Sequence, residues 1–170
     1  LVYGWAIKRY FARSQPVAPA MRALGILGIL VAATHLWGIW AYPRDTDWAI
    51  LLCIACYLAG LLLFTWTCRT CSAHPIPLAF DPKLPDQIVA HGPYRWMRHP
   101  FYTSYSLTWI AGVLASTSVL PLIASAVILT FYAVTALAEE RRLLRSAMAD
   151  QYRDYRRQTG LFFPRPFSQP

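Results

Sequence analysis

Long apolar segments set the pattern of hydrophobic and polar positions along this chain. Residues 23–42 have Thr34 and His35 as their strongly polar positions, and residues 48–67 carry no charge. Residues 101–138 are also uncharged and can hold two spans, because about 17 residues suffice for each. The pattern predicts an all-α integral membrane protein with about four transmembrane helices, at about 23–42, 48–67, 101–116 and 119–138.

The last two of these segments are predicted to form a helical hairpin. Ser116-Thr117-Ser118 is a suitable turn between them. Pro121 then falls in the first turn of the returning helix, where its missing backbone donor costs little. The returning segment either crosses the membrane or forms half of a hairpin that does not cross fully.

Lysine and arginine are distributed unevenly among the segments that flank these spans. Of the sixteen basic residues, only Arg44 lies in the loops on one side. The other fifteen precede the first span, lie between the second and third, or follow the fourth. Because cytoplasmic segments carry the excess of Lys and Arg, both termini and the loop 68–100 are predicted to be cytoplasmic. This topology accounts for the net charge of +8, so we expect no nucleic-acid partner.

The chain is predicted to form a single membrane domain over residues 1–170. Residues 1–20 suit either an interfacial segment or the end of a truncated span, because aromatic and basic side chains mix there. The loop 68–100 is rich in proline in its first half and is expected to be irregular. The tail 139–170 is predicted to contain an amphipathic C-terminal helix.

The predicted tail helix runs from Glu139 to about Arg157 and has one apolar stripe. Glu140 lies on this stripe, whereas Glu139 points elsewhere. At four-residue steps the stripe contains Ala136, Glu140, Leu144, Met148 and Tyr152. A carboxylate on a buried face is costly unless it meets a cation. Glu140 therefore either pairs with a nearby arginine, for instance Arg98, or serves as a ligand.

The cysteines and histidines do not combine into a predicted metal site. In the pairs Cys53-x-x-Cys56 and Cys68-x-x-Cys71, Cys68 follows Cys56 by twelve residues, roughly 18 Å along a helix axis, so the four thiols cannot reach one ion. We interpret Cys53 and Cys56 as small core residues, and Cys68 and Cys71 as free or acylated thiols at the membrane edge. His35 is either a functional group inside the first span or, as we favour, a neutral imidazole bonded to a neighbouring helix.

The densest polar and aromatic cluster is the run G-P-Y-R-W-M-R-H-P-F-Y at residues 92–102. A basic and aromatic membrane anchor explains these residue types, but not why His99-Pro100 opens a span. Pro100 favours a first helical turn, so free amides there would bind an anion beside Arg98. These amides belong to Phe101, Tyr102 and Thr103. With Glu140 opposite, the site suits a zwitterion whose carboxylate lies at Arg98 and whose ammonium lies near Glu140, while aromatic rings face a cationic sulfonium.

This run is followed by a short hairpin and then by A-E-E-R-R-L-L and Y-R-D-Y. Together these motifs resemble the isoprenylcysteine carboxyl methyltransferase family of integral-membrane methyltransferases. The resemblance covers residues 45–166 and is strongest over 86–104 and 138–166. R-H-P-x-Y with a downstream E-E at this spacing is specific, whereas either half alone would be weak. Phospholipid N-methyltransferases and certain sterol reductases carry versions of the same element.

The resemblance implies S-adenosylmethionine as the cofactor, held by the loop before the third span, the R-H-P-x-Y turn and the glutamate pair. The implied contacts are Ile88, Val89, Tyr94, His99, Pro100, Phe101, Tyr102 and Glu140. Arg98 is added from the charge argument above. His99 and Tyr102 are the candidate catalytic residues for an acceptor that needs a base.

Two departures from the family concern the acceptor rather than the cofactor. Its eukaryotic members have a histidine where this chain has Asp86, and an arginine implicated in handling the substrate carboxylate where this chain has Ala136. Fourteen arginines against two lysines favour a prokaryotic gene, and hence a prokaryotic cell membrane. We therefore expect methyl transfer to an O, N or S atom of a lipophilic small-molecule or lipidated acceptor held among membrane lipids.

Two alternatives belong to other functional classes. A reductase that shares R-H-P-x-Y is one, although 170 residues leave little room for a nicotinamide dinucleotide pocket. The other is a non-enzymatic membrane scaffold or anion-binding protein.

Overall fold

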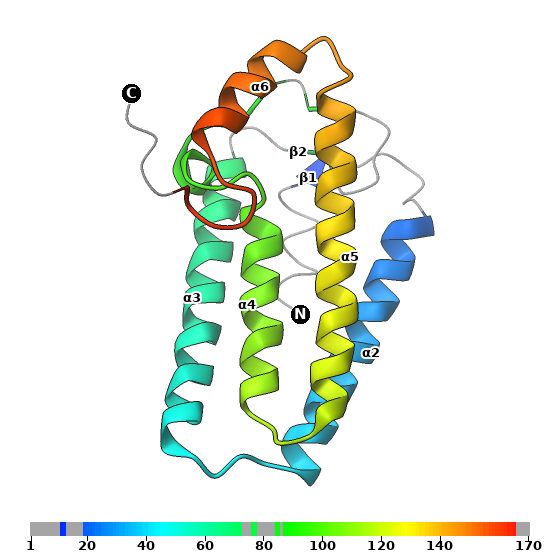
Figure 1. The fold of residues 1–170 in the computed structure, drawn as a ribbon, viewed down its shortest axis with the longest axis vertical. Helices are drawn as coiled ribbons and strands as arrows, with labels where there is room; N and C mark the ends of the chain where they lie inside the picture. The colour runs from blue at the N-terminus through cyan, green and yellow to red at the C-terminus, as the bar shows by residue number, and fades with distance from the viewer. Residues whose placement is uncertain (1–10, 13–18, 73–75, 78–83, 86, 166–170) are drawn as a thin grey trace.

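Helices make up most of the part of the chain that the structure describes. This part comprises residues 11–12, 19–72, 76–77, 84–85 and 87–165 of the computed structural model. Its α-helices are α2 (Pro19–Ala41), α3 (Asp47–Cys71), α4 (Pro100–Leu114), α5 (Val119–Leu143) and α6 (Ala149–Gln158), and a 3₁₀ turn, η1, covers Gly92–Arg95. Helices α2 to α5 form a bundle, and α6 lies across one end of it (Figure 1). The predicted all-α architecture is confirmed.

Three helices among the described residues are long and apolar enough to cross a bilayer. They are α2, α3 and α5, with 23, 25 and 25 residues. Helix α4 has 15 residues, which at ~1.5 Å each makes it about 22 Å long, less than the ~30 Å of a hydrocarbon core. The two segments of the predicted hairpin, 101–116 and 119–138, are both helical. The first corresponds to the short helix α4, and the second lies within the long helix α5. Helix α3 continues past its predicted end, so the loop begins after Cys71 rather than at 68.

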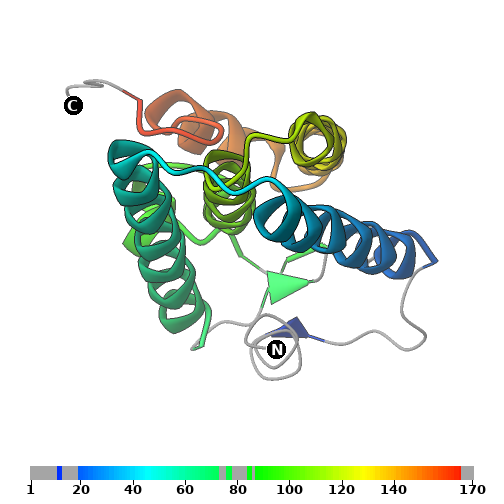
Figure 2. The same cartoon turned by 90° about the horizontal axis from the view of Figure 1, so that it is seen from below.

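Helix α4 is the central helix of the bundle. It packs against α3 on one side and α5 on the other, while α2 packs mainly on α5 (Figures 1 and 2). One apolar cluster joins α3 to α4 around Phe64 and Phe101, whose ring centroids are 5.7 Å apart. A second cluster joins α2, α4 and α5 around Val31, Tyr102 and Ile128. Because α4 contributes to both clusters, its N-terminal end is held from two sides.

His35 of α2 bonds a neighbouring helix, as the sequence analysis predicts. Its Nε2 lies 2.9 Å from Ser125 Oγ of α5, and its ring meets Trp109 of α4 edge-on at 5.6 Å. Gly112 of α4 faces the imidazole so closely that an added Cβ would collide with it. The histidine thus joins three helices, which confirms the structural interpretation of this residue.

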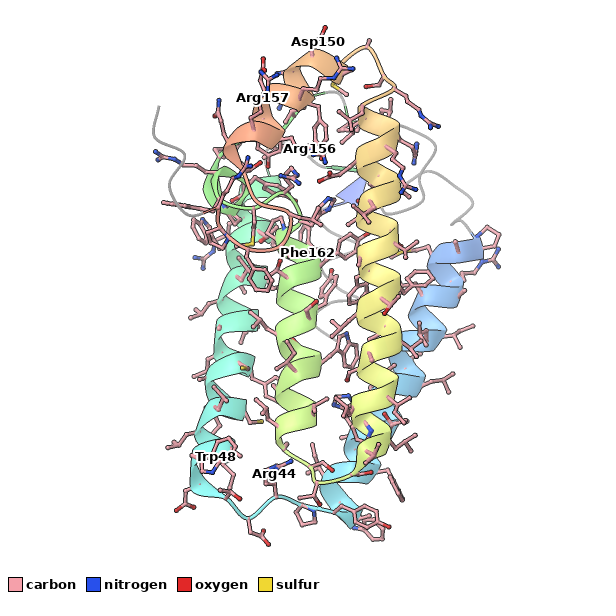
Figure 3. The ribbon with its side chains drawn as sticks, viewed as in Figure 1. Arg44, Trp48, Asp150, Arg156, Arg157 and Phe162 are labelled. Atoms are coloured by element: carbon pink, nitrogen blue, oxygen red, sulfur yellow. The ribbon has the colours of Figure 1, made fainter. Side chains whose placement is uncertain are left out.

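The turn between α4 and α5 forms where the sequence predicts it. Ser118 caps α5 with its side-chain oxygen. The backbone N–H of Thr117 donates to the Tyr42 carbonyl at 3.0 Å, and Arg44 Nη2 donates to the Ser116 carbonyl at 3.0 Å. These bonds fasten the α4–α5 turn to the α2–α3 loop at the end of the bundle opposite α6 (Figure 3).

The continuous tail helix predicted from Glu139 to Arg157 is wrong, because the chain bends between α5 and α6. Helix α5 ends at Leu143. The Ser146 hydroxyl donates to the Leu143 carbonyl at 2.8 Å and accepts from the Met148 amide at 3.2 Å. A serine side chain that bonds nearby backbone groups in this way competes with helical bonding. The bend turns α6 back over the end of the bundle (Figure 1).

A short parallel contact joins β1 (Phe11–Ala12) to β2 (Ile76–Pro77). It pairs a piece of the N-terminal segment with a piece of the proline-rich loop, which agrees with an extended loop. The interfacial placement of residues 1–20 stays a prediction, since most of that segment lies outside the described residues. Asp86 also lies outside them.

Candidate active site

The stretch before α4 turns at Gly92 and buries the Tyr94 ring. Gly92 has a φ of +59°, where a side chain would be strained, and an added Cβ would collide with Thr70 of α3. The Tyr155 hydroxyl of α6 donates to the Tyr94 carbonyl at 2.7 Å, and Cys71 Sγ donates to the Tyr94 hydroxyl at 3.6 Å. Burial raises the pKa of Tyr94, so this hydroxyl stays protonated. The turn thereby joins α3 and α6 to the start of α4.

Most of the apolar residues among the predicted cofactor contacts form a wall beside α3. Val89, Tyr94 and Phe101 share one buried cluster, while Pro100 is buried and Ile88 is half-buried. The members of this cluster on α3 are Phe64, Cys68 and Cys71. Both of these cysteines are free thiols within the protein core rather than at an exposed membrane edge.

The start of α4 is closed by residues 159–162, which we call the closing segment. Helix α4 begins at Pro100, as predicted, with His99 as its N-cap. The amides of Arg98 and His99 donate to carbonyls of the closing segment at 2.9 and 3.1 Å. The Thr103 amide donates to the His99 carbonyl at 3.1 Å. Thr103 therefore has no free amide for an anion, which corrects that part of the prediction.

Arg98 and Glu140 form a buried ion pair. Arg98 Nε lies 2.5 Å from Glu140 Oε1, and their side chains are 8% and 4% exposed. Arg98 Nη1 also donates to the carbonyls of Thr159 and Arg156. The pairing alternative for Glu140 is therefore realised, and Arg98 connects α5, the end of α6 and the closing segment. The apolar stripe correctly predicted that Glu140 is buried.

The His99 ring lies between the two glutamates of α5. Its Nδ1 is 3.7 Å from Glu139 Oε2 and its Nε2 is 3.6 Å from Glu140 Oε1. The Tyr102 hydroxyl donates to Glu139 Oε1 at 2.8 Å, and the Tyr102 ring stacks on His99 at 5.6 Å. Glu139 therefore points into the same corner, contrary to the prediction that it points elsewhere. Glu139 and Glu140 are consecutive on α5, and both reach the His99 ring because each faces a different ring nitrogen.

Sequence reasoning missed three parts of this corner. One is Glu139, which the motif R-H-P-x-Y with a downstream E-E does not by itself distinguish from a surface residue. The second is the closing segment, whose Phe162 ring lies 6.0 Å from the His99 ring. The third is Tyr152 of α6, which is buried. Burial, together with the charge of nearby Glu140, raises the pKa of Tyr152. Its place on the four-residue stripe was the available signal.

The corner combines acidic, basic and aromatic groups that fit a small zwitterion carrying an extra positive charge. Two carboxylates face the His99 ring, and His99 Nε2 is buried without a hydrogen-bond partner among the described residues. A buried polar atom normally has a partner, so Nε2 is a natural contact for a ligand. The rings of Tyr102 and Phe162 lie beside His99, and aromatic rings attract a cation such as a sulfonium. No cluster of metal-binding side chains occurs in the described part of the chain.

The sequence pattern of the phospholipid methyltransferase family matches residues 48–151, more than half of the chain. The chain belongs to the phospholipid methyltransferase family. The matched family region extends from α3 to the beginning of α6 and contains every predicted site residue.

The chain is also similar to two methyltransferases, one by sequence and one by structure. A methanethiol S-methyltransferase of Mycobacterium tuberculosis is 37% identical over 78 residues, which are 45% of this chain and 30% of that protein. The solved structure of the eukaryotic intramembrane Ras methyltransferase, isoprenylcysteine carboxyl methyltransferase, matches 88% of this chain and 54% of that chain with a TM-score of 0.65 at 21% identity. The chain thus matches about a third to a half of each relative's length. The resemblance inferred from the motifs is confirmed for family and fold.

Proposed function

We propose that this family member transfers a methyl group from S-adenosylmethionine to an O, N or S atom of a lipophilic, membrane-borne acceptor. The observation that supports it best is the convergence of the α4 start with the glutamate pair of α5. His99 lies within 3.7 Å of both Glu139 and Glu140, and Tyr102 bonds Glu139. Carboxylates and aromatic rings at one buried corner suit a cationic cofactor.

S-Adenosylmethionine, when bound, supplies an electrophilic methyl group on a positively charged sulfur. We assign its ammonium to Glu139 and Glu140, and its carboxylate to Arg98 and the start of α4. The buried ion pair with Arg98 holds the Glu140 side chain in position. The apolar wall assigned to the adenosine consists of Ile88, Val89, Tyr94, Pro100 and Phe101. Oriented groups that exclude water lower the barrier mainly by positioning.

His99 is the base we assign for acceptors that must lose a proton. Its Nε2 is buried without a hydrogen-bond partner among the described residues, and a carboxylate lies within 3.7 Å of each ring nitrogen. The Tyr102 hydroxyl donates to Glu139 and is thereby oriented rather than ionised. A thiolate or carboxylate acceptor needs no base, so His99 then only lines the site.

The acceptor is proposed to approach from the bilayer. The Tyr102 ring stacks on the Tyr132 ring of α5 at 5.3 Å, so the side of the corner toward the bundle is aromatic. An acceptor with a hydrocarbon part is suited to apolar surroundings of this kind. The cofactor is proposed to enter from the cytoplasm of a prokaryotic cell. The distribution of arginine predicts that both termini lie on that side.

Calorimetry of the detergent-solubilised protein with S-adenosylhomocysteine tests the cofactor assignment. We expect saturable binding by the wild type and binding weakened at least about tenfold by Glu140→Gln, since a charge-assisted contact is lost. Asp150→Asn is the matched control, because the Asp150 side chain is 96% exposed on α6. Absence of heat with the wild type, or equal binding by the Glu140→Gln variant, would overturn the assignment.

The identity of the acceptor requires a separate experiment. Membranes that contain the protein are incubated with methyl-labelled S-adenosylmethionine, and the labelled product is extracted and identified. A lipophilic methylated product that disappears with Glu140→Gln supports the proposal. Protection of the protein against heat by NADPH instead would favour a reductase, and retained cellular function after joint loss of His99 and Glu140 would favour a scaffold.

A further inference from the structure

A strongly basic groove lies beside the candidate active site, on its outer side. It has a volume of about 520 Å³ and is lined by five arginines and by Thr159, Gly160 and Leu161 of the closing segment. The arginines of this basic groove are Arg98, Arg153, Arg156, Arg157 and Arg165. Three of them come from α6, which places the groove at the end of the bundle opposite Arg44 (Figure 3).

Arg98 forms the inner wall of the basic groove and is paired with Glu140. Its Nε binds Glu140, and its Nη1 donates to two backbone carbonyls. Arg156 has a second and looser approach to the same carboxylate, with Nε 3.6 Å from Glu140 Oε2. One carboxylate thus faces two guanidinium groups at the inner wall, so positive charge is left over there.

The outer arginines of the basic groove are only weakly neutralised. Arg153 and Arg157 each pair with an aspartate three residues earlier on α6, at 2.5 and 3.2 Å. Both aspartates are exposed, with side-chain exposures of 96% and 68%. Exposed pairs of this kind are weak because water screens them, so they do not hold the guanidinium groups against a better partner. Arg165 is fixed by a bond from its Nη1 to the Arg157 carbonyl.

Several guanidinium groups around one concave surface match the oxygens of a phosphate. A guanidinium binds phosphate through paired N–H donors, and adjacent like charges repel each other until an anion joins them. The Thr159 hydroxyl is not a ligand for that anion, because it donates to the Tyr155 carbonyl at 2.7 Å. Recognition therefore depends on the arginines, which favours an oxyanion with several acceptor oxygens over a single carboxylate.

The surroundings of the basic groove favour a lipid as the source of this phosphate. Trp96, whose carbonyl bonds the closing segment, and Phe163, which follows that segment in the chain, are 50% and 76% exposed. The Gly160 amide donates to the Trp96 carbonyl at 3.2 Å, so the Trp96 backbone lies directly against the closing segment. Exposed aromatic side chains beside arginines at the end of a membrane bundle are typical of the headgroup layer. We propose that the basic groove binds the phosphate of an anionic phospholipid headgroup.

Calorimetry of the full chain in a neutral detergent tests this site directly, without any methyl transfer. The probes are short-chain phosphatidylglycerol, short-chain phosphatidylcholine and inorganic phosphate. The variant is Arg153→Gln with Arg157→Gln, and the matched control is Arg141→Gln with Arg145→Gln, which removes the same charge from exposed positions that do not line the groove. Thermal melting of each variant checks that it is folded.

We expect saturable phosphatidylglycerol binding by the wild type and the control pair, weakened at least about tenfold in the groove pair. Phosphatidylcholine, whose phosphate is masked by a cationic group, should bind more weakly. If both double variants weakened phosphatidylglycerol binding equally, general surface charge would explain the binding and the proposed site would be overturned. Competition by inorganic phosphate as strong as that of the lipid would retain a phosphate site but overturn the lipid as its source.

Discussion

Arg98 and Glu140 form a buried ion pair that joins the segment just before α4 to the last turn of α5, with Arg98 Nε 2.5 Å from Glu140 Oε1. Arg98 also reaches the carbonyls of Arg156 and Thr159. One side chain therefore holds three separate parts of the chain around the His99 ring. Loss of the Arg98 side chain should therefore lower the free energy of unfolding and disturb the geometry of the candidate active site.

Arg98→Gln should destabilise the protein by about 3 kcal/mol, because removal of one partner leaves the Glu140 carboxylate buried with less compensation. The measurement is the free energy of unfolding of the detergent-solubilised protein. Arg141→Gln, at an exposed position of α5, is the control and should change it by less than about 0.5 kcal/mol. Similar small effects of both variants would contradict the importance of the pair.

Tyr102→Phe should weaken S-adenosylhomocysteine binding by about tenfold while leaving the fold intact. The substitution removes the hydrogen bond to Glu139, which is worth about 1.5 kcal/mol or more for a charged acceptor, but keeps the ring stacked on His99. Tyr132→Phe is the control from the same aromatic stack, since its hydroxyl accepts from Trp109 instead. Equal affinities of the wild type and Tyr102→Phe would show that Glu139 needs no such orientation.

Alkaline pH should destabilise the protein partly through Tyr152. Burial and the charge of Glu140 raise the pKa of Tyr152 above its ordinary value of 10. Above about pH 10 the unfolded chain releases this proton while the folded protein keeps it, so stability falls as pH rises and is unaffected below that value. Tyr152→Phe should therefore reduce the slope of unfolding free energy against pH by up to about 1.4 kcal/mol per unit. An unchanged slope would show that this tyrosine ionises equally in both states.

Gly112→Ala should destabilise the bundle by about 1–3 kcal/mol, because the new Cβ would collide with the His35 ring. Gly25→Ala is the control, since nothing lies near its added Cβ, and there alanine should be neutral or stabilising by up to about 1 kcal/mol. Thermal unfolding in detergent separates the two. The Gly112 penalty should shrink in a His35→Ala background, and a penalty that persists unchanged would place its origin elsewhere.

The orientation in the membrane can be tested by cysteine labelling of intact cells. Cysteines introduced at Asp45 and Arg157, both exposed and at opposite ends of the bundle, provide the two reporters. A membrane-impermeant maleimide should label Asp45→Cys in intact cells and Arg157→Cys only after permeabilisation. The unsubstituted protein is the blank, because its cysteines lie within or beside the core. The reverse pattern of labelling would invert the predicted topology.

The helices and the burial of Glu140 were predictable because they depend on local patterns. Uncharged segments set the spans, Pro100 sets the start of α4, and a four-residue stripe puts Glu140 on the buried face. The bend at Ser146 was missed because it depends on a single side chain that bonds the backbone in place of helical partners. Sequence periodicity continues through such a bend without a break.

The position of Glu139 was not predictable from helix periodicity. On α5 alone it faces away from Glu140, and only the placement of the His99 ring between the two carboxylates brings both into one site. That placement depends on the backbone bonds between His99 and Leu161 and on the packing of α4. Contacts between segments this distant in the sequence leave no local pattern to detect.

The pairing of residues 98–99 with the closing segment also sets the order in which the site is made during synthesis. When a ribosome has produced α4 and α5, both can already be in the membrane, yet the backbone partners at Gly160 and Leu161 do not yet exist. The histidine corner is therefore finished only after α6 has emerged and folded back. Until that moment the nascent chain has its helices without the backbone partners that fix the start of α4.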